Sequence, residues 1–368
     1  MKLTVPHIGH LDVFLDTLGK TIGPEFIAPP KTSPRTLSLG MKYAPPSTCL
    51  PFKFILGNFI EALEQGADTI AMVSDHGPCR VGMYDVVMQQ ILRDLGFHFT
   101  WISMDDTQIW RDYLVRFNRE RRARGVSIWR TLRALRLGWK KLRFCEKVEF
   151  LAHRIRPLER KRGETTRVEA QCIKLIHGVN HPNQLREVWK ECLRLFDRIE
   201  KDFTRKPLKV VITGEGYIVI NPHANQEIER RLGEMGVEVT RTVWISHKIA
   251  HALHLDCFIP KSKAKAIKAS KPYLKYNLGG ECNSSIGYPI LFKRAGFEGA
   301  IQLLPLGCML EAVAKPILVR VSKEYDLPIL TFSFDENLSE TMVTTRLSAF
   351  IDLLQRRRER SYLKQEKK

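Results

Sequence analysis

The chain is 368 residues long, 44% hydrophobic and 9% aromatic, and carries a formal net charge of +19. This length and apolar content are enough to bury the cores of two or three domains. The N-terminal segment has no apolar run with a small-residue cleavage site, and no stretch reaches about 18 uninterrupted apolar residues. We therefore expect a cytoplasmic protein rather than a secreted or membrane-spanning one.

Eight cysteines are spread along the chain without the clustered spacing of a disulfide framework. A reducing compartment keeps thiols free. The cysteines are therefore available for packing or for ligating metal.

The first 105 residues alternate between strand-like and helix-like patterns. We predict strands at 3–6, 26–28, 69–75 and 99–104, and helices at 52–65 and 80–95. Such alternation is typical of parallel βαβ units. Residues 1–105 are therefore assigned to an N-terminal α/β domain.

Residues 106–205 lose the strand pattern and become basic and helical, with a break from Arg156-Pro157 to Gly163. Residues 111–167 contain 19 Lys or Arg and 6 Asp or Glu, a net charge of +13. We predict a helical domain here. Four large apolar residues have the spacing of one packed helix face, with a solvated basic face opposite; they are Trp129, Leu132, Leu135 and Trp139.

A second α/β series occupies residues 206–356, and the residues after it form a charged tail, 357–368, that we expect to fray. We predict strands at 208–216, 237–245, 299–305 and 327–334, and helices at 226–235, 288–295, 309–325 and up to Leu354. The fold class is thus α/β, with two Rossmann- or flavodoxin-like parallel-sheet domains and a helical basic domain between them. The two α/β halves share a design, although no internal sequence repeat is convincing.

Three cysteines stand where helices are predicted to begin. Cys49 lies in a turn with Pro51 at the start of the helix, Cys79 follows a strand through His76-Gly77-Pro78, and Cys308 follows a strand through Pro305-Leu306-Gly307. Helix N-termini carry free N–H donors and partial positive charge, which stabilise a thiolate or an anionic iron-sulfur core. Ordinary packing of small apolar residues is the alternative interpretation.

The residues around these cysteines, together with segments elsewhere in nearly the whole chain, form recognisable sequence motifs. The relevant segments are Cys49 to Lys53, Gly57 to Leu63, Gly77 to Arg80, Arg156-Pro157 with Glu159 and Gly163, Pro222, Asn225, Pro305 to Met309 with Glu311, Asp335-Glu336, and Thr345 to Leu347 with Ala349-Phe350. In these segments the chain resembles the 2-hydroxyacyl-CoA dehydratase D-components and related dehydratase-like iron-sulfur proteins.

The resemblance implies a 4Fe-4S cluster bound by three cysteines, with one iron open to another ligand. Matched motif to motif, those cysteines are Cys49, Cys79 and Cys308. Such dehydratases receive a low-potential electron from an ATP-hydrolysing activator and pass it to a CoA thioester, which then loses a hydroxyl group through a ketyl radical. A related branch binds a sulfide-bridged pair of clusters and reduces small molecules. The resemblance therefore implies a lyase subunit or an ATP-dependent reductase, paired with a homologous subunit or a second copy.

Two features depart from the family pattern. Where the family commonly has Phe-Gly-Cys-Met-Pro-Glu, this chain has Leu306 to Glu311 without that proline, and Pro316 falls within the following helix. Gly214-Glu215-Gly216 lacks the spacing and the lysine of a phosphate-binding loop. ATP is therefore assigned to the partner, and no substrate-binding residue is carried over.

Further residues could serve the same site, each with a structural alternative. Cys282, in a predicted loop, could be a fourth ligand; Lys53 and Arg80 could offset cluster charge or contact CoA phosphates, or be solvated surface. The remaining candidates are Asp335-Glu336 and Arg346 for the cleft, which could equally form an ion pair or helix cap, and His76 as a proton donor, which could equally stabilise its turn. The other cysteines are assigned to packing; they are Cys145, Cys172, Cys192 and Cys257.

Two alternative functions stay open at this point. One is a non-catalytic electron-transfer or scaffold subunit of such a system. The other is nucleic-acid binding by the basic segment 111–167, which contains no zinc-finger or RNP pattern. Docking of an acidic activator, electron carrier or CoA fits the same charge.

Overall fold

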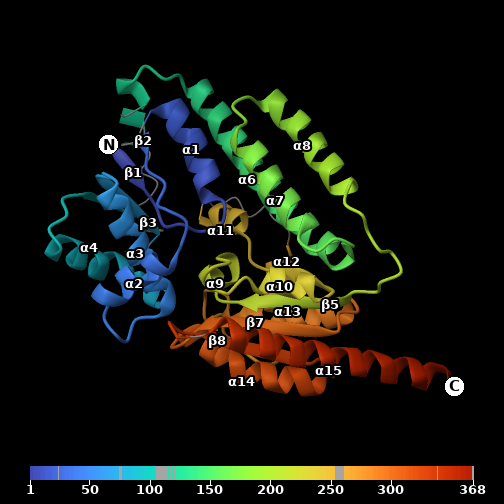
Figure 1. Ribbon diagram of the computed structural model, residues 1–368. Coiled ribbons are helices and arrows are strands. Elements are labelled where there is room, and N and C mark those ends of the chain that lie inside the picture. The colour runs from blue at the N-terminus through green and yellow to red at the C-terminus, as the bar shows by residue number, and fades with distance from the viewer. Residues whose placement is uncertain are drawn as a thin grey trace. The chain divides into compact units, whose positions relative to one another are not determined.

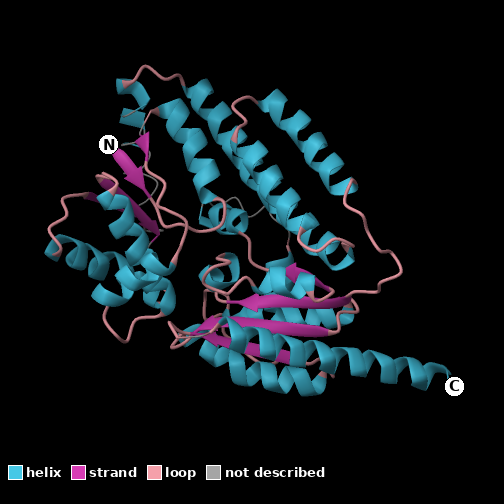
Figure 2. Cartoon of the chain, in the orientation of Figure 1, coloured by secondary structure: helices cyan, strands magenta, loops and turns pink. Residues whose placement is uncertain are grey.

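The computed structural model describes residues 1–23, 25–73, 77–104, 115, 118–119, 121–252, 261–337 and 339–366. The chain divides into two compact units. Unit 1 comprises residues 1–146, 174–189 and 244–259, and unit 2 comprises residues 147–173, 190–243 and 260–368. Figure 1 follows the chain through both units, and Figure 2 separates helices from strands.

Unit 1 contains a four-stranded parallel sheet with the order β2-β1-β3-β4. Its strands are β1 (Lys2–Thr4), β2 (Glu25–Phe26), β3 (Thr69–Val73) and β4 (Thr100–Met104). Its helices include α1 (Leu11–Ile22), α2 (Pro34–Tyr43), α3 (Leu50–Glu64), the 3-10 turn η1 (Arg80–Met83) and α4 (Tyr84–Asp94). Helix α3 is buried from Leu50 to Leu63, which makes it the central helix of this unit.

Unit 2 contains a second four-stranded parallel sheet, with the order β6-β5-β7-β8. Its strands are β5 (Leu208–Gly214), β6 (Val237–Arg241), β7 (Gly299–Pro305) and β8 (Ile329–Phe334). Its helices include α9 (Gly216–Ile220), α10 (Ile228–Glu234), α12 (Ser262–Ser270), α13 (Cys282–Arg294), α14 (Met309–Glu324) and α15 (Glu340–Glu366). Every residue of β7 is buried.

The remaining helices are α6 (Ile128–Ile155), the 3-10 turn η2 (Arg156–Leu158), α7 (Glu164–His177), α8 (Pro182–Asp197) and α11 (Ile245–Ala252). Three of them, α6, α7 and α8, contribute residues to both units. The expectation of two parallel-sheet domains with many helices is confirmed. The predicted domain boundaries stay a prediction.

The two units share a detailed backbone design that the sequence comparison within the chain did not reveal. In each, a helix pair crosses at a glycine: a Cβ on Gly57 would lie 1.9 Å from the Thr36 carbonyl oxygen, and one on Gly287 would lie 1.8 Å from that of Ala266. Such distances leave no room for a side chain. The helix pairs α2–α3 and α12–α13 therefore pack backbone to backbone in the same way.

A second shared detail lies where the sheet of each unit begins. The carboxylate of Asp68 accepts a hydrogen bond from the Lys2 amide at 2.7 Å, and that of Glu298 accepts one from the Lys209 amide at 2.9 Å. Each acidic residue precedes the third strand in chain order of its sheet. We infer that the units are structural repeats whose side chains have diverged while backbone contacts are kept.

The C-terminal tail is more ordered than predicted. Helix α15 continues to Glu366, so the expectation that the tail from residue 357 onward frays is wrong. The Arg358 guanidinium donates to Glu298 Oε2 at 2.6 Å and to the Pro207 carbonyl oxygen at 2.9 Å. These contacts hold the charged helix to the sheet of unit 2.

Candidate functional site

Cys49 caps the buried helix α3, as predicted. It is the N-cap residue, with extended backbone angles (φ −71°, ψ 157°), and Pro51 follows within the first two helical positions. The side chain is buried, and its Sγ lies 2.7 Å from the hydroxyl oxygen of Tyr84. The thiol therefore belongs to the residue that starts a helix and contacts a hydroxyl group.

Cys79 occupies the equivalent capping position before η1 and α4, again as predicted. The adjacent Arg80 donates to the carbonyl oxygen of Ser47 at 2.7 Å. Tyr84, on α4, packs edge-to-face on Phe52 of α3 at 5.0 Å between ring centroids. Because Arg80 and Tyr84 both reach the Cys49 turn, unit 1 holds the Cys49 and Cys79 turns side by side.

Cys308 caps α14 in unit 2, the third predicted helix start. The turn before it closes through a hydrogen bond from its amide to the Pro305 carbonyl oxygen at 3.0 Å, and Gly307 supplies the left-handed residue (φ +75°). The apolar neighbours Leu306 and Met309 are 60% and 51% exposed. The Cys308 turn is thus fixed in backbone shape and presents an apolar surface to its surroundings.

Cys79 and Cys308 hold the same topological position. Each follows the third strand in chain order of a parallel sheet, β3 or β7, and each is the N-cap of the next helical segment. The carboxyl end of a parallel strand is where open α/β sheets place ligands. The repeat therefore places Cys79 and Cys308 at the carboxyl edges of the two sheets, and unit 1 adds Cys49.

A buried carboxyl lies one turn after Cys308. Glu311 is 1% exposed, and its two carboxylate oxygens accept hydrogen bonds from Ser285 Oγ and Gln302 Nε2, both at 2.8 Å. Burial raises the pKa of Glu311 to about 7, with smaller contributions from Glu281 and Glu215, against those two hydrogen bonds. The sequence motif contained Glu311 but gave no indication of its burial. A carboxyl with this pKa can accept or donate a proton near neutral pH.

The Glu311 pKa predicts a pH-dependent stability. Between its ordinary value of 4.5 and about 7 the folded chain holds a proton that the unfolded chain has lost. The contribution of Glu311 to the free energy of unfolding is therefore fully present below pH 4.5. It is lost as pH rises from 4.5 through 7, which lowers the free energy of unfolding by about 3 kcal/mol. In a Glu311→Gln variant, we expect this decrease in the free energy of unfolding between pH 5 and pH 8, measured by urea unfolding, to be absent. The exposed Glu359→Gln change serves as control, and an unchanged pH profile in Glu311→Gln would contradict the assignment.

Several candidate residues have structural partners. Arg346 donates to the Thr331 carbonyl oxygen at 2.8 Å and stacks over the Phe332 ring, and Asp335 accepts the Asn337 amide at 2.9 Å. These contacts favour the structural alternative for both. Cys282 begins α13 and is fully buried, so the prediction of a loop there is wrong.

The remaining candidates divide between buried and undescribed positions. Lys53 is 5% exposed within α3, whereas Arg80 is exposed apart from its bond to Ser47. Three cysteines assigned to packing are fully buried; they are Cys145, Cys172 and Cys192. His76 and Cys257 lie outside the described residues.

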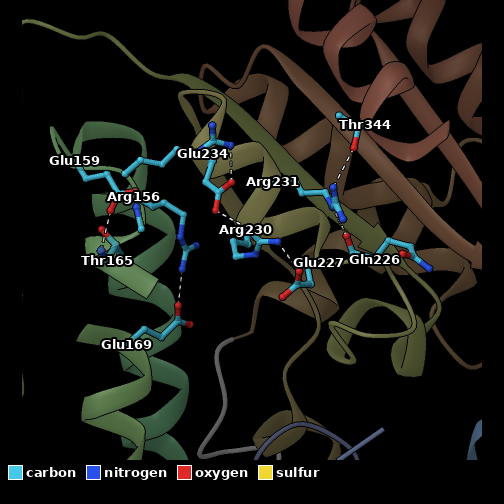
Figure 3. Close-up of polar contacts among 12 residues, drawn as sticks. Arg156, Glu159, Thr165, Glu169, Gln226, Glu227, Arg230, Arg231, Glu234 and Thr344 are labelled. Atoms are coloured by element: carbon cyan, nitrogen blue, oxygen red, sulfur yellow. Dashed lines mark hydrogen bonds and ion pairs between the residues drawn. The ribbon is translucent and has the colours of Figure 1, made fainter. Parts of the chain in front are cut away.

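The Arg-Pro-x-Glu motif at η2 belongs to a polar network in unit 2 (Figure 3). Arg156 is buried and pairs with Glu169 at 2.5 Å, while Glu159 accepts the amides of Gly163 at 2.9 Å and Thr165 at 2.7 Å. Glu159 thereby satisfies free donors at the start of α7. The motif stabilises the turn between α6 and α7, and Figure 3 shows the neighbouring pairs of Arg230 with Glu227 and Glu234.

The basic segment presents a different face from the one predicted. Trp129 is 78% exposed and Leu132 is 43% exposed, so the expectation that they belong to a packed face is wrong. The buried face of α6 is offset along the helix and contains Leu137, Leu142 and Cys145. The spacing alone did not distinguish these two stripes.

A hollow of about 430 Å³ borders the exposed indole of α6. Its lining consists of Trp129, Leu132, Arg133, Arg136, Leu137, Lys140 and Pro182. The combination of an open aromatic ring with three cations suits an anionic ligand that also has an apolar or aromatic part. Residues 105–114, which include the first four residues of the basic segment 111–167, lie outside the described residues.

Comparison with known families decides the relationship of the chain. A family model described as the CoA enzyme activase uncharacterised domain matches residues 8–243. The chain belongs to this family. The family is related to the superfamily of 2-hydroxyacyl-CoA dehydratases and their activases. The match to the CoA enzyme activase domain includes Cys49 and Cys79, whereas Cys308 lies beyond it. No protein with a curated description matches the chain.

Within the described part of the chain, each helix is too short or too polar to cross a membrane.

Proposed function

We propose that this member of the CoA enzyme activase domain family is a 4Fe-4S protein of a CoA-dependent enzyme system. Cys49, Cys79 and Cys308 would bind the cluster. The protein would accept low-potential electrons from an ATP-dependent activator and serve the radical dehydration of a 2-hydroxyacyl-CoA or the reduction of another small substrate. The observation that carries the proposal is the placement of three cysteines as N-caps, two of them at equivalent positions of repeated sheets.

The donor set fits such a cluster. All three thiols belong to N-cap residues with extended backbone angles, where the helix amides favour negative charge. None of the three side chains makes a hydrogen bond that caps its own helix. When bound, the cluster would supply one-electron transfer at low potential.

The chain's own groups would prepare the site. Tyr84 places a hydroxyl 2.7 Å from Cys49 Sγ, and Arg80 ties the Cys79 turn to the Cys49 turn through Ser47. Hydrogen bonds to the ligating sulfurs tune iron-sulfur sites. Near Cys308, Glu311 offers a proton-exchanging carboxyl in a buried polar environment.

The α6 hollow supports an anionic partner in the same system. Arg133, Arg136 and Lys140 lie on one helix with the exposed Trp129, a combination that suits the phosphates and adenine ring of CoA. An acidic activator would meet the same charges. The proposal therefore assigns this surface to CoA or to the activator rather than to nucleic acid.

The function is tested by anaerobic reduction assays on the full chain. The cluster-loaded protein is mixed with a CoA enzyme activase, a low-potential reductant and a 2-hydroxyacyl-CoA, with and without ATP. We expect a paramagnetic reduced cluster and loss of the hydroxyl group only when ATP is present. ATP-dependent reduction without turnover of the thioester would favour the electron-transfer alternative, and no ATP-dependent reduction would reject both.

A further inference from the structure

Three possible metal ligands gather in unit 1, away from the cysteine-bearing turns in the sequence. They are His10, Asp12 and His177, and each offers one ligand atom within 4.8 Å of the other two. His10 is the N-cap residue of α1, Asp12 lies in the first turn of that helix, and His177 is the last residue of α7. All three side chains are partly exposed. An ion bound there would keep access to solvent.

Helix α6 holds both ligand-bearing helices. On the α1 side, Gly138 packs so closely on Phe14 that a Cβ would lie 3.1 Å from the Phe14 carbonyl oxygen. On the α7 side, the buried Lys141 donates its ammonium group to the carbonyl oxygens of His177 and Val179, both at 3.0 Å. A single helix therefore fixes the backbones that carry the ligands, which is the arrangement a preformed metal site requires.

The separations are close to those of a coordinated ion. Asp12 Oδ2 and His177 Nε2 lie 3.8 Å apart. Two ligands on one zinc ion, each at about 2.1 Å, can be at most about 4.2 Å apart. Pairs near the 4.8 Å limit would close by rotation of partly exposed side chains, which costs little.

We propose that His10, Asp12 and His177 bind a divalent first-row transition metal ion such as zinc or iron. Two imidazoles and one carboxylate are a common donor set for these ions, and three protein ligands leave coordination positions open. The alternative is an ion pair between Asp12 and His177 with no ion bound. The proposal uses none of the three cysteines and stands independently of the proposed function.

Neighbouring charges set the strength of the site. Asp16 and Lys20 form a pair on α1 at 2.7 Å, and Lys141 is a buried cation in contact with the His177 carbonyl oxygen. Both oxygens that Lys141 contacts are main-chain carbonyls, so it does not occupy the ligand atoms. Its charge lowers the affinity for a cation, whereas the Asp12 and Asp16 carboxylates raise it.

Cobalt(II) binding to the full chain tests the proposal, because its visible spectrum separates nitrogen and oxygen ligands from sulfur. We expect an ion with nitrogen and oxygen ligands, and binding to these ligands roughly tenfold or more weaker in His177→Gln and in Asp12→Asn. The matched controls are Asp94→Asn, exposed on α4, and His181→Ala, exposed beyond α7. Both controls should bind as the wild type does.

Zinc-dependent thermal stability gives a second readout that does not depend on the spectrum. Zinc should raise the melting temperature of the wild type and of both controls, and should leave that of Asp12→Asn unchanged. Circular dichroism without metal checks that each variant folds. Equal cobalt affinity in the wild type and Asp12→Asn, or cobalt spectra showing sulfur ligation alone, would overturn the proposal.

Discussion

A full-length chain carrying Cys79→Ala is expected to retain almost no cluster iron after anaerobic reconstitution. Alanine provides no ligand, and Cys79 stands at the start of the helical segment after β3, where we propose that it binds one of the four irons. Cys308→Ala, at the equivalent position of the other sheet, should have the same effect. Iron and acid-labile sulfide, measured per chain, give the result directly.

The control for these changes is Cys145→Ala. Cys145 is fully buried in α6 and is assigned to packing, so its loss should reduce stability slightly and leave the iron content unchanged. If Cys79→Ala and Cys308→Ala bound as much iron as Cys145→Ala, both residues would be excluded as ligands.

Replacing Arg241 by methionine is expected to destabilise unit 2 by about 3–5 kcal/mol. Arg241, on β6, is 4% exposed and pairs with Glu149 at 2.5 Å and Glu229 at 3.2 Å. Without the guanidinium both carboxylates would lose a buried ion pair, and His153 would lie 3.3 Å from Glu229. Urea unfolding at neutral pH measures the loss.

The pH dependence of this variant has a definite sign. Burial tends to raise the pKa of Glu229, but Arg241 and His153 outweigh burial and hold that pKa below 4.5. Glu229 therefore stabilises the wild type above that pH, and this contribution is lost as pH falls through its folded-state pKa. In Arg241→Met the carboxyl would protonate at higher pH, so the deficit should shrink between pH 7 and pH 5.

A surface arginine on α6 provides the comparison. Arg154 is 58% exposed and pairs with Glu238 at 3.6 Å, so Arg154→Met should change the unfolding free energy by less than about 1 kcal/mol. Equal stability of Arg241→Met and Arg154→Met would show that the buried pair is not needed for the fold.

Much of the fold could be predicted from local sequence patterns. The strand at 299–305 has the bounds of β7, because a wholly buried parallel strand is a continuous apolar run bordered by turn residues. The tail could not be predicted, because α15 beyond Leu354 is held by contacts such as Arg358 with Glu298, which are remote in sequence. The buried face of α6 could not be predicted either. Exposed Trp129 and buried Leu137 both belong to apolar stripes with helical spacing, so spacing alone does not show which stripe is buried.

The candidate site was predictable in part for the same reason. Cys49, Cys79 and Cys308 were placed at helix starts because turn residues precede each one locally. Tyr84 and Glu311 were missed because their roles come from contacts across the fold, with Cys49 and with Gln302. His10 and His177 are far apart in the chain, and no local pattern joins them.

Mössbauer spectroscopy of the anaerobically reconstituted wild type, loaded with isotopically enriched iron, tests the central proposal most directly. We expect about four irons per chain, with roughly one in four distinguishable from the rest because it lacks a cysteine ligand. Mononuclear iron, or iron that does not assemble with sulfide, would contradict the assignment of Cys49, Cys79 and Cys308 as ligands of a 4Fe-4S cluster.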